Sequence, residues 1–206
     1  MKYLDFHKVF SKLGCFDVNQ IKMVQPNFDR SALTRWMAAG HIVHLKNGLY
    51  AFKDWISTPG VDLIVANLMY RPSYISLYSA LSHYGMIPEF IAHTTSVTTL
   101  KTVVFKNDLG SFDYRHIKPE LFWGYQIIDA TSNRKALMAL PEKALLDLLY
   151  LTPSLKNEDD MLQLRLDEDY MTSEFNRDLA LQYLERIKSK ALSQRFNLLQ
   201  KAYLND

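Results

Sequence analysis

The chain of 206 residues has little cysteine, glycine or proline: one Cys, seven Gly and seven Pro. The single thiol, Cys15, excludes an internal disulfide and a zinc site built from cysteines, and we interpret it as a small core residue. No apolar run approaches the roughly 20 residues that span a bilayer. Asp5 interrupts the first residues, where a secretory signal is apolar. We therefore expect a cytoplasmic protein that does not contact the membrane.

The net charge is only +2, but the charges are unevenly distributed. Residues 1–58 carry eight Lys and Arg against four Asp and Glu, whereas the remainder carries sixteen against eighteen. A basic N-terminal segment on a slightly acidic body is typical of a protein in which only that segment contacts phosphates.

The first 40 residues predict three short helices. Apolar residues at helical spacing favour a helix over residues 3–13. Asp17 is a candidate N-cap for a second helix, which ends before Pro26. Asp29 is a candidate N-cap for a third helix, and Gly40 ends it.

Residues 41–53 predict a β-hairpin. Asn47-Gly48 separates two alternating runs and favours a type I′ turn, which needs positive φ at both central residues. Such a two-residue loop places Val43, Leu45, Tyr50 and Phe52 on one face, and His44, Lys46, Leu49 and Ala51 on the other. Three helices followed by a hairpin are typical of a winged helix-turn-helix.

The third helix carries most of the candidate DNA-binding residues. Its spacing turns Leu33, Trp36 and Met37 towards the core and leaves the polar residues outside. An arginine can bind guanine with two hydrogen bonds in the major groove, and Ser or Thr can bind bases or phosphates. The polar residues of the hairpin could reach the DNA backbone or the minor groove. The candidate set is Arg30, Ser31, Thr34, Arg35, His44, Lys46 and Asn47.

Thr58-Pro59-Gly60 marks the expected domain boundary, with a winged helix over 1–57 and a second domain over 58–206. Residues 93–131 are rich in β-branched and aromatic residues and predict three to five antiparallel strands. Helices are predicted over 61–70, 74–86, 141–151, 172–188 and 190–204. The fold class that we expect is α+β: a winged helix-turn-helix, then a mixed α/β domain with a small antiparallel sheet and C-terminal helices.

The chain contains no P-loop and no GxGxxG, HExxH or GxSxG motif. Gly110-Ser111 is not followed by the paired carboxylates that a nucleotidyltransferase uses. The acidic runs at 158–160 and 167–169 lack the glycine and the ligand spacing of a calcium loop, so we interpret them as a solvated face. We expect no catalytic residues, no metal and no cofactor.

Several motifs, in this order, resemble the AbiEi-type family of abortive-infection antitoxins and transcriptional regulators, which belong to type IV toxin–antitoxin systems. The resemblance covers about residues 5–155, and we identify no family pattern in the tail from about residue 156. The matching elements are Gly48-Leu49-Tyr50, Y-I-S-x-x-S-A-L over 74–81, Val97-Thr98, G-x-F-x-Y-x-x-I over 110–117 and P-E-K-A-L-L-D over 141–147.

The resemblance implies a repressor of its own operon that binds inverted repeats in promoter double-stranded DNA. It also implies a neighbouring nucleotidyltransferase-like toxin, which the second domain antagonises without a stable direct complex. Because one winged helix buries little DNA surface, we expect two copies on DNA, as a homodimer or a cooperative pair. Within the last motif, we expect Glu142, Lys143 and Asp147 to be exposed.

Two other classes of function remain open from the residues alone. The winged helix could dock a protein partner without binding DNA. Alternatively, the chain could be a nucleotide-handling enzyme, which would bind a nucleotide or a metal within residues 90–170. Salt dependence of DNA binding separates the first alternative from a DNA-binding protein.

Overall fold

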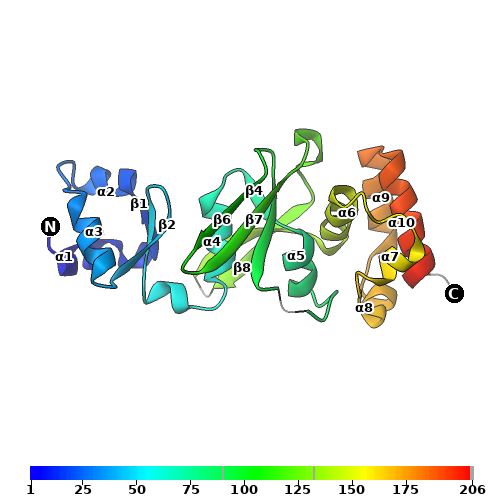
Figure 1. Cartoon of the computed structure of the whole chain (residues 1–206), viewed down its shortest axis with the longest axis horizontal. Helices are drawn as coiled ribbons and strands as arrows, with labels where there is room; N and C mark the ends of the chain where they lie inside the picture. The colour runs from blue at the N-terminus through cyan, green and yellow to red at the C-terminus, as the bar shows by residue number, and fades with distance from the viewer. Residues whose placement is uncertain (90, 132, 205–206) are drawn as a thin grey trace.

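The computed structural model describes residues 1–89, 91–131 and 133–204 and has an α+β fold. The first 57 residues, here called the N-terminal unit, form three helices and a three-stranded antiparallel sheet. Figure 1 shows this unit at one end of the molecule and the last helices at the other. Its elements are α1 (Tyr3–Phe10), the 3-10 turn η1 (Ser11–Leu13), β1 (Cys15–Asp17), α2 (Val18–Val24), α3 (Ser31–Ala38), β2 (Ile42–Lys46), β3 (Leu49–Phe52) and the 3-10 turn η2 (Trp55–Ser57).

The predicted helix ends are confirmed in part. Asp17 caps α2 through a capping box, in which its side chain accepts from the Gln20 backbone and the Gln20 side chain accepts in return. The N-cap position of α3 is Arg30 and not Asp29. Asp29 still satisfies a backbone donor of the first turn, because its Oδ1 accepts from the N–H of Ser31 at 2.9 Å.

The register of the β2–β3 hairpin differs from the predicted one. His44 lies opposite Tyr50, and the register shifts between His44 and Lys46. Gly48 has a φ of 80°, but the backbone of Asn47 does not have positive φ, so the type I′ prediction is wrong. A shift of one residue moves the following side chains to the opposite face. The predicted faces of the hairpin are therefore wrong as well.

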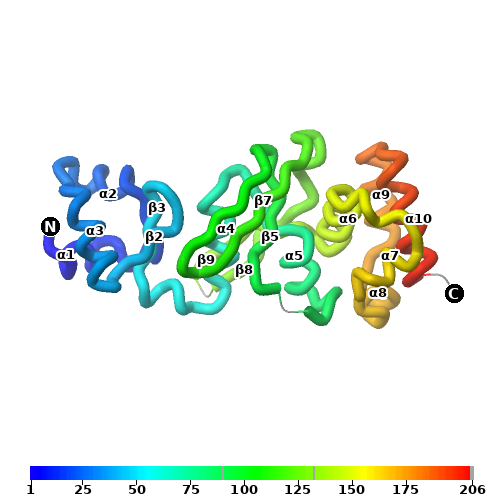
Figure 2. Tube along the Cα trace, viewed as in Figure 1, coloured from blue at the N-terminus to red at the C-terminus, as the bar shows by residue number. Residues whose placement is uncertain are grey.

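The three-stranded sheet separates two hydrophobic cores. The face that carries Phe16, Ile42 and Phe52 packs against the helices of the N-terminal unit. The opposite face packs into the larger core of the remaining chain. Figure 2 shows the hairpin between the N-terminal helices and the rest of the molecule. The residues that this face contributes to the larger core are Cys15, Val43, Leu45 and Ala51.

Residues 58–204, here called the second unit, contain a six-stranded sheet in the order β6-β7-β5-β4-β9-β8. The prediction of an antiparallel sheet is confirmed only in part: β6–β7, β4–β5 and β8–β9 pair antiparallel, whereas β5–β7 and β4–β9 pair parallel. Alternation along a strand is the same in both directions, so it does not reveal the direction of pairing. The elements before α6 are α4 (Val61–Met69), β4 (Ser73–Ile75), α5 (Leu77–His83), β5 (His93–Thr98), β6 (Val103–Asn107), β7 (Gly110–His116), η3 (Pro119–Leu121), β8 (Tyr125–Thr131) and β9 (Arg134–Ala139).

The helix predicted over 74–86 is a strand followed by a shorter helix. Tyr74 and Ile75 lie in β4, where both side chains are fully buried. Leu77, the first residue of α5, has a φ of 58°. This left-handed conformation changes the direction of the backbone between β4 and α5. The apolar residues of 74–86 thus keep a helical spacing over a longer segment than α5 occupies.

The last part of the chain is helical: the first of these helices packs on α5, and the later ones pack on that helix and on one another. Helix α6 (Pro141–Leu151) begins at proline as predicted. The predicted helix over 172–188 is shorter, because Asn176 caps α9 (Arg177–Ile187). Two short helices precede it, α7 (Glu158–Leu162) and α8 (Glu168–Ser173), and α10 (Lys190–Tyr203) follows. Within the described residues, no helix is long and apolar enough to cross a bilayer.

Candidate nucleic-acid interface

Helix α3 is held in place by aromatic packing on its inner face. Trp36 is 8% exposed, and its ring centroid lies 4.6 Å from that of Phe6 and 5.9 Å from that of Phe28. Leu33 is also buried in this core, and Met37 is partly buried. The predicted inner face of the helix is therefore confirmed.

The outer face of α3 is exposed to solvent. Ser31, Thr34 and Arg35 are exposed along the helix, and Arg30 is exposed at its start. This face presents two guanidinium groups and two hydroxyl groups within two helical turns. Its chemistry suits hydrogen bonding to base edges or phosphates.

A polar network links the first turn of α3. The hydroxyl of Ser31 donates to Asp29 Oδ2, and Arg35 Nη1 donates to Ser31 Oγ at 2.7 Å. Arg35 Nη2 also lies 3.6 Å from Asp29 Oδ2. The hydrogen bonds from Ser31, assisted by Arg35, hold the pKa of Asp29 below its usual value. The side chains of Asp29 and Arg35 are both about two-thirds exposed, at 67% and 66%, so this pair can exchange for other partners.

A groove of about 560 Å³ lies between α3 and the hairpin. It brings together four of the predicted DNA-binding residues, although they are up to 17 positions apart in the sequence. The other three, Ser31, Arg35 and His44, lie outside its lining. The four residues in the lining are Arg30, Thr34, Lys46 and Asn47.

The two basic residues of the hairpin differ in their surroundings. His44 is exposed, and its ring centroid lies 5.3 Å from that of Tyr50. Lys46 is only partly exposed, and its ammonium donates to the backbone oxygen of Met69. The same ammonium lies 5.8 Å and 5.6 Å from the ring centroids of Tyr70 and Phe105. The charge of Lys46 is therefore held by the second unit, which sequence reasoning does not foresee.

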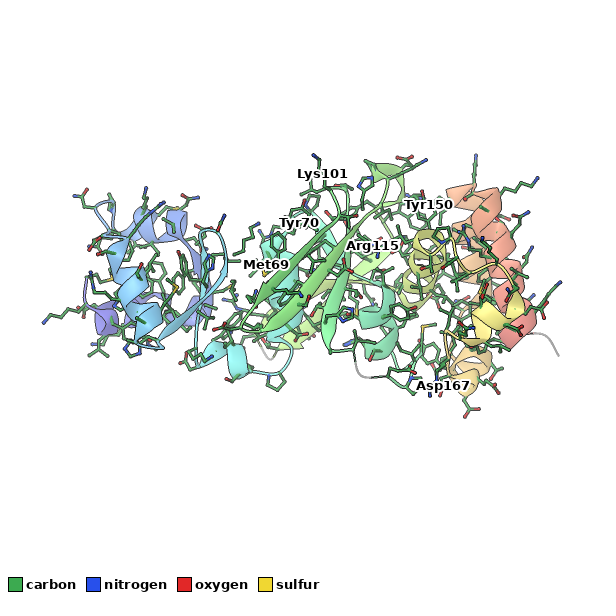
Figure 3. The ribbon with its side chains drawn as sticks, in the orientation of Figure 1. Met69, Tyr70, Lys101, Arg115, Tyr150 and Asp167 are labelled. Atoms are coloured by element: carbon green, nitrogen blue, oxygen red, sulfur yellow. The ribbon has the colours of Figure 1, made fainter. Side chains whose placement is uncertain are left out.

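Further contacts fix the N-terminal unit to the second unit. Asn107 Nδ2 donates to the backbone oxygen of Leu45 at 3.0 Å. The guanidinium of Arg134 donates to the backbone oxygens of Lys12 and Leu13 and lies 5.3 Å from the ring centroid of Trp55. Figure 3 shows Met69 and Tyr70 at the side of the second unit that faces the hairpin. The closing helices α9 and α10 lie at the far end of the molecule, away from α3 (Figure 1).

A second polar cluster lies buried between β4 and α6. Lys143 Nζ donates to the hydroxyl of Tyr74 at 2.7 Å and also to Asp147. The hydroxyls of Tyr74 and Ser76 donate to Asp147 Oδ2 at 2.9 Å and 2.8 Å. Lys143 is 0% exposed and Asp147 is 3% exposed. The sequence motifs over 74–81 and 141–147 thus meet in one network inside the core.

The expectation that Glu142, Lys143 and Asp147 are exposed is therefore wrong. The closing helices cover α6, and Glu142 Oε1 accepts from the backbone N–H of Asn176, the N-cap of α9. Burial lowers the pKa of Lys143 and raises the pKa of Asp147. Burial, with the nearby Asp147, also raises the pKa of Tyr74. The i, i+4 spacing of Lys143 and Asp147 in an apolar helix is the one sequence signal for such a pair.

The acidic runs near the C-terminus act as helix caps. Asp160 belongs to the capping box of α7, and the side chain of Asp167 accepts from the backbone of Tyr170 in α8. Among residues 1–89, 91–131 and 133–204, no three His, Cys, Asp or Glu side chains are grouped so that they could hold a metal ion. No protein-family profile and no curated protein sequence matches the chain.

Proposed function

We propose that the N-terminal unit is a winged helix-turn-helix that binds double-stranded DNA with α3 in the major groove. In this proposal, Arg30, Ser31, Thr34 and Arg35 contact base edges and neighbouring phosphates. Asn47 at the tip of the hairpin, with His44 beside it, contacts the DNA backbone. The full chain is then a bacterial transcriptional autoregulator that acts in the cytoplasm.

One observation carries the proposal: the groove that joins the exposed face of α3 to the hairpin. A recognition helix needs an outer face free of protein contacts and a rigid inner face, and the Trp36 packing supplies the second. Arg30 and Thr34 on the helix and Asn47 on the hairpin line the same groove. A duplex that met α3 would therefore also meet the hairpin tip.

Tight and specific binding requires more contact than one such unit offers. A single module buries about 600–1,000 Å² of protein surface on DNA, the lower end for specific complexes. We therefore include two copies in the proposal, bound to inverted repeats in the promoter as a homodimer or a cooperative pair. Half-sites on one side of the duplex would lie about 34–36 Å apart.

The antitoxin part of the proposal rests on the family resemblance. In it, the second unit antagonises a nucleotidyltransferase-like toxin encoded in the adjacent reading frame, without a stable complex. The buried network of Lys143, Asp147 and Tyr74 explains the conspicuous motifs as packing, so this role falls to exposed residues of the second unit. Growth of cells that express the neighbouring gene, with and without this chain, tests the antitoxin role directly.

The test of DNA binding is a fluorescence anisotropy titration with the DNA directly upstream of the coding sequence. Wild-type protein should bind that fragment more tightly than a scrambled one. The logarithm of the association constant should fall with the logarithm of salt concentration, with a slope of about −0.9 per phosphate neutralised. Arg30→Ala and Arg35→Ala should each weaken specific binding by roughly 5- to 100-fold.

The matched control is Arg115→Ala, because Arg115 is an exposed arginine in β7 of the second unit. Its loss should leave DNA affinity within about twofold of wild type, a difference well below that of one base contact. Wild-type affinity in the Arg30→Ala/Arg35→Ala double variant would refute the assignment of α3. Equal binding of all DNA with no salt dependence would refute the proposal as a whole.

One observation favours the protein-docking alternative. Leu4 on α1 and Met23 and Val24 on α2 are 71%, 84% and 55% exposed, so the N-terminal unit presents apolar side chains to solvent. A docking module predicts that Met23→Ser abolishes partner binding, whereas a DNA-binding protein tolerates this change. Titration with the upstream fragment separates the two functions: a docking module shows no saturable DNA binding in wild type, whereas a DNA-binding protein binds the fragment and Met23→Ser leaves its affinity unchanged.

A further inference from the structure

A cleft of about 710 Å³ lies in the second unit, at the side of α4 that borders β8 and β9. Beside it, β4 and β9 pair at one position only, Ile75 with Met138. Two residues earlier in each strand, Ser73 and Ala136 line the cleft and do not pair with each other, although each pairs with its other neighbouring strand. Ligand pockets for small molecules occupy about 300–1,000 Å³, so the cleft has a suitable size.

The side chain of Asn67 closes one end of this gap. Its Oδ1 accepts from the backbone N–H of Leu137, and its Nδ2 donates to the backbone oxygen of Leu137 at 3.4 Å. The amide thus takes the place of a neighbouring strand along β9. The gap between the strands is therefore a fixed feature of the fold, and its hydrogen bonds are satisfied at this end.

The walls of the cleft are mainly apolar. Ile64 and Leu68 come from α4, and Phe122 precedes β8. On β8, Tyr125 and Ile127 are 37% and 64% exposed and extend this apolar wall to the rim of the cleft. The cleft therefore offers an aromatic and aliphatic surface that the described residues do not cover.

The charged residues in the lining are all basic: Arg71, Arg134 and Lys135. Arg134 is committed to the N-terminal unit through the backbone of residues 12 and 13. Arg71 uses its Nε to reach the backbone oxygen of Asn67 at 3.3 Å, and within the described residues its two terminal nitrogens make no hydrogen bond. Lys135 has an exposed partner, Asp129, at 3.5 Å, which water screens strongly.

Ser73 also belongs to the lining of the cleft. Ser73 is 4% exposed, and its Oγ has no hydrogen-bond partner among the residues that the structure describes. The hydroxyl itself is shielded from solvent, so the exposed polar groups of the lining are those of Arg71 and Lys135. The cleft thus combines an apolar body with a few polar groups, as small-molecule sites do.

We propose that this cleft binds a small organic anion: an aromatic or short aliphatic body in the apolar part, with one carboxylate or sulfonate near Arg71 and Lys135. Positive charge without a carboxylate in the lining favours anions over cations and neutral ligands. This site does not depend on the proposed DNA binding, because α3 lies in the other unit.

The test uses 8-anilinonaphthalene-1-sulfonate, which joins two aromatic ring systems to one sulfonate, and follows its fluorescence with the full chain. Wild-type protein should bind one molecule per chain at saturation. Arg71→Gln/Lys135→Gln should raise the dissociation constant by about fivefold or more, because two attractive charges are lost. The neutral analogue N-phenyl-1-naphthylamine should bind both proteins with equal affinity.

A second variant tests the location of the site through an exposed residue, so that folding is preserved. Ile127→Glu places a carboxylate at the rim of the cleft and should weaken binding of the sulfonate at least as much. The matched control is Val104→Glu, since Val104 is 52% exposed in β6 at the other edge of the sheet. Circular dichroism confirms that each variant is folded. Wild-type affinity in both the Arg71/Lys135 and Ile127 variants, or no saturable binding to wild type, would overturn the proposal.

Discussion

Asp29 Oδ2 and Arg35 Nη2 face each other at 3.6 Å across the first turn of α3, with the hydroxyl of Ser31 hydrogen bonded to both residues. A carboxylate is thus paired with one of the two guanidinium groups on the face that we propose for DNA binding. Phosphate would have to replace Asp29 as the partner of Arg35, and the carboxylate would repel it. The free protein therefore holds this face in a partly neutralised state.

Asp29→Asn should raise the affinity for the upstream DNA fragment by roughly two- to fivefold at low salt, because it removes one negative charge from the interface. Asparagine keeps an oxygen that can accept from the Ser31 backbone, so α3 should still form. Anisotropy titration measures the effect. Asp129→Asn is the control, because it removes the carboxylate of another exposed pair, with Lys135, in the second unit. Unchanged or weaker binding of Asp29→Asn would contradict the prediction.

The same carboxylate predicts a pH dependence of stability. The pKa of Asp29 is lower in the folded chain than in the unfolded chain, where it is about 3.9. Its contribution is therefore present above pH 4 and is lost as the pH falls through the folded-state value. The difference in melting temperature between wild type and Asp29→Asn should be larger at pH 6 than at about pH 3. A difference that is the same at both values would show that ionised Asp29 has no role in holding α3.

The N-terminal helices could be predicted from local signals. Asp17, Pro26 and Gly40 mark helix starts and ends through their effect on neighbouring backbone groups. Such local effects can be recognised directly in the sequence. The hairpin faces could not be predicted in this way. Both faces of the ribbon are apolar because each meets a different core, and alternation then does not identify the register.

The buried cluster shows a second limit of sequence reasoning. Charged residues at 143 and 147 are exposed in most helices, so their burial depends on what covers α6. The covering helices α9 and α10 are distant in sequence, and no local pattern predicts where they dock. Four candidate DNA-binding residues lie together in the lining of one groove. The contact between Lys46 and Met69 could not be predicted, because it depends on how the two units pack together.

Lys46→Met should lower stability more than it lowers DNA affinity. The ammonium of Lys46 donates to the Met69 backbone oxygen and lies near two aromatic rings, and methionine keeps only the apolar stem. Loss of a charged hydrogen bond of this kind costs about 1–2 kcal/mol at a partly exposed position. Urea unfolding measures this cost, and salt titration of DNA binding should give an unchanged slope. A slope reduced by about one unit would instead show that Lys46 neutralises a phosphate.

The buried pair of Lys143 and Asp147 gives the strongest expected effect on stability. Lys143→Met leaves the Asp147 carboxylate buried with only the hydroxyls of Tyr74 and Ser76 as partners. Removing one member of a buried pair costs about 3–5 kcal/mol, whereas replacing both members by apolar residues of similar size is often nearly neutral.

The Lys143→Met/Asp147→Leu double variant should therefore be more stable than Lys143→Met alone, provided that the larger core accepts the added volume. The double-mutant cycle, measured by urea unfolding, gives the coupling between the two residues. Because both side chains are at most 4% exposed, high salt should screen their coupling far less than that of the exposed Lys135 and Asp129. Additive effects of the two single substitutions would contradict a direct interaction, and the network would then be a set of independent contacts around α6.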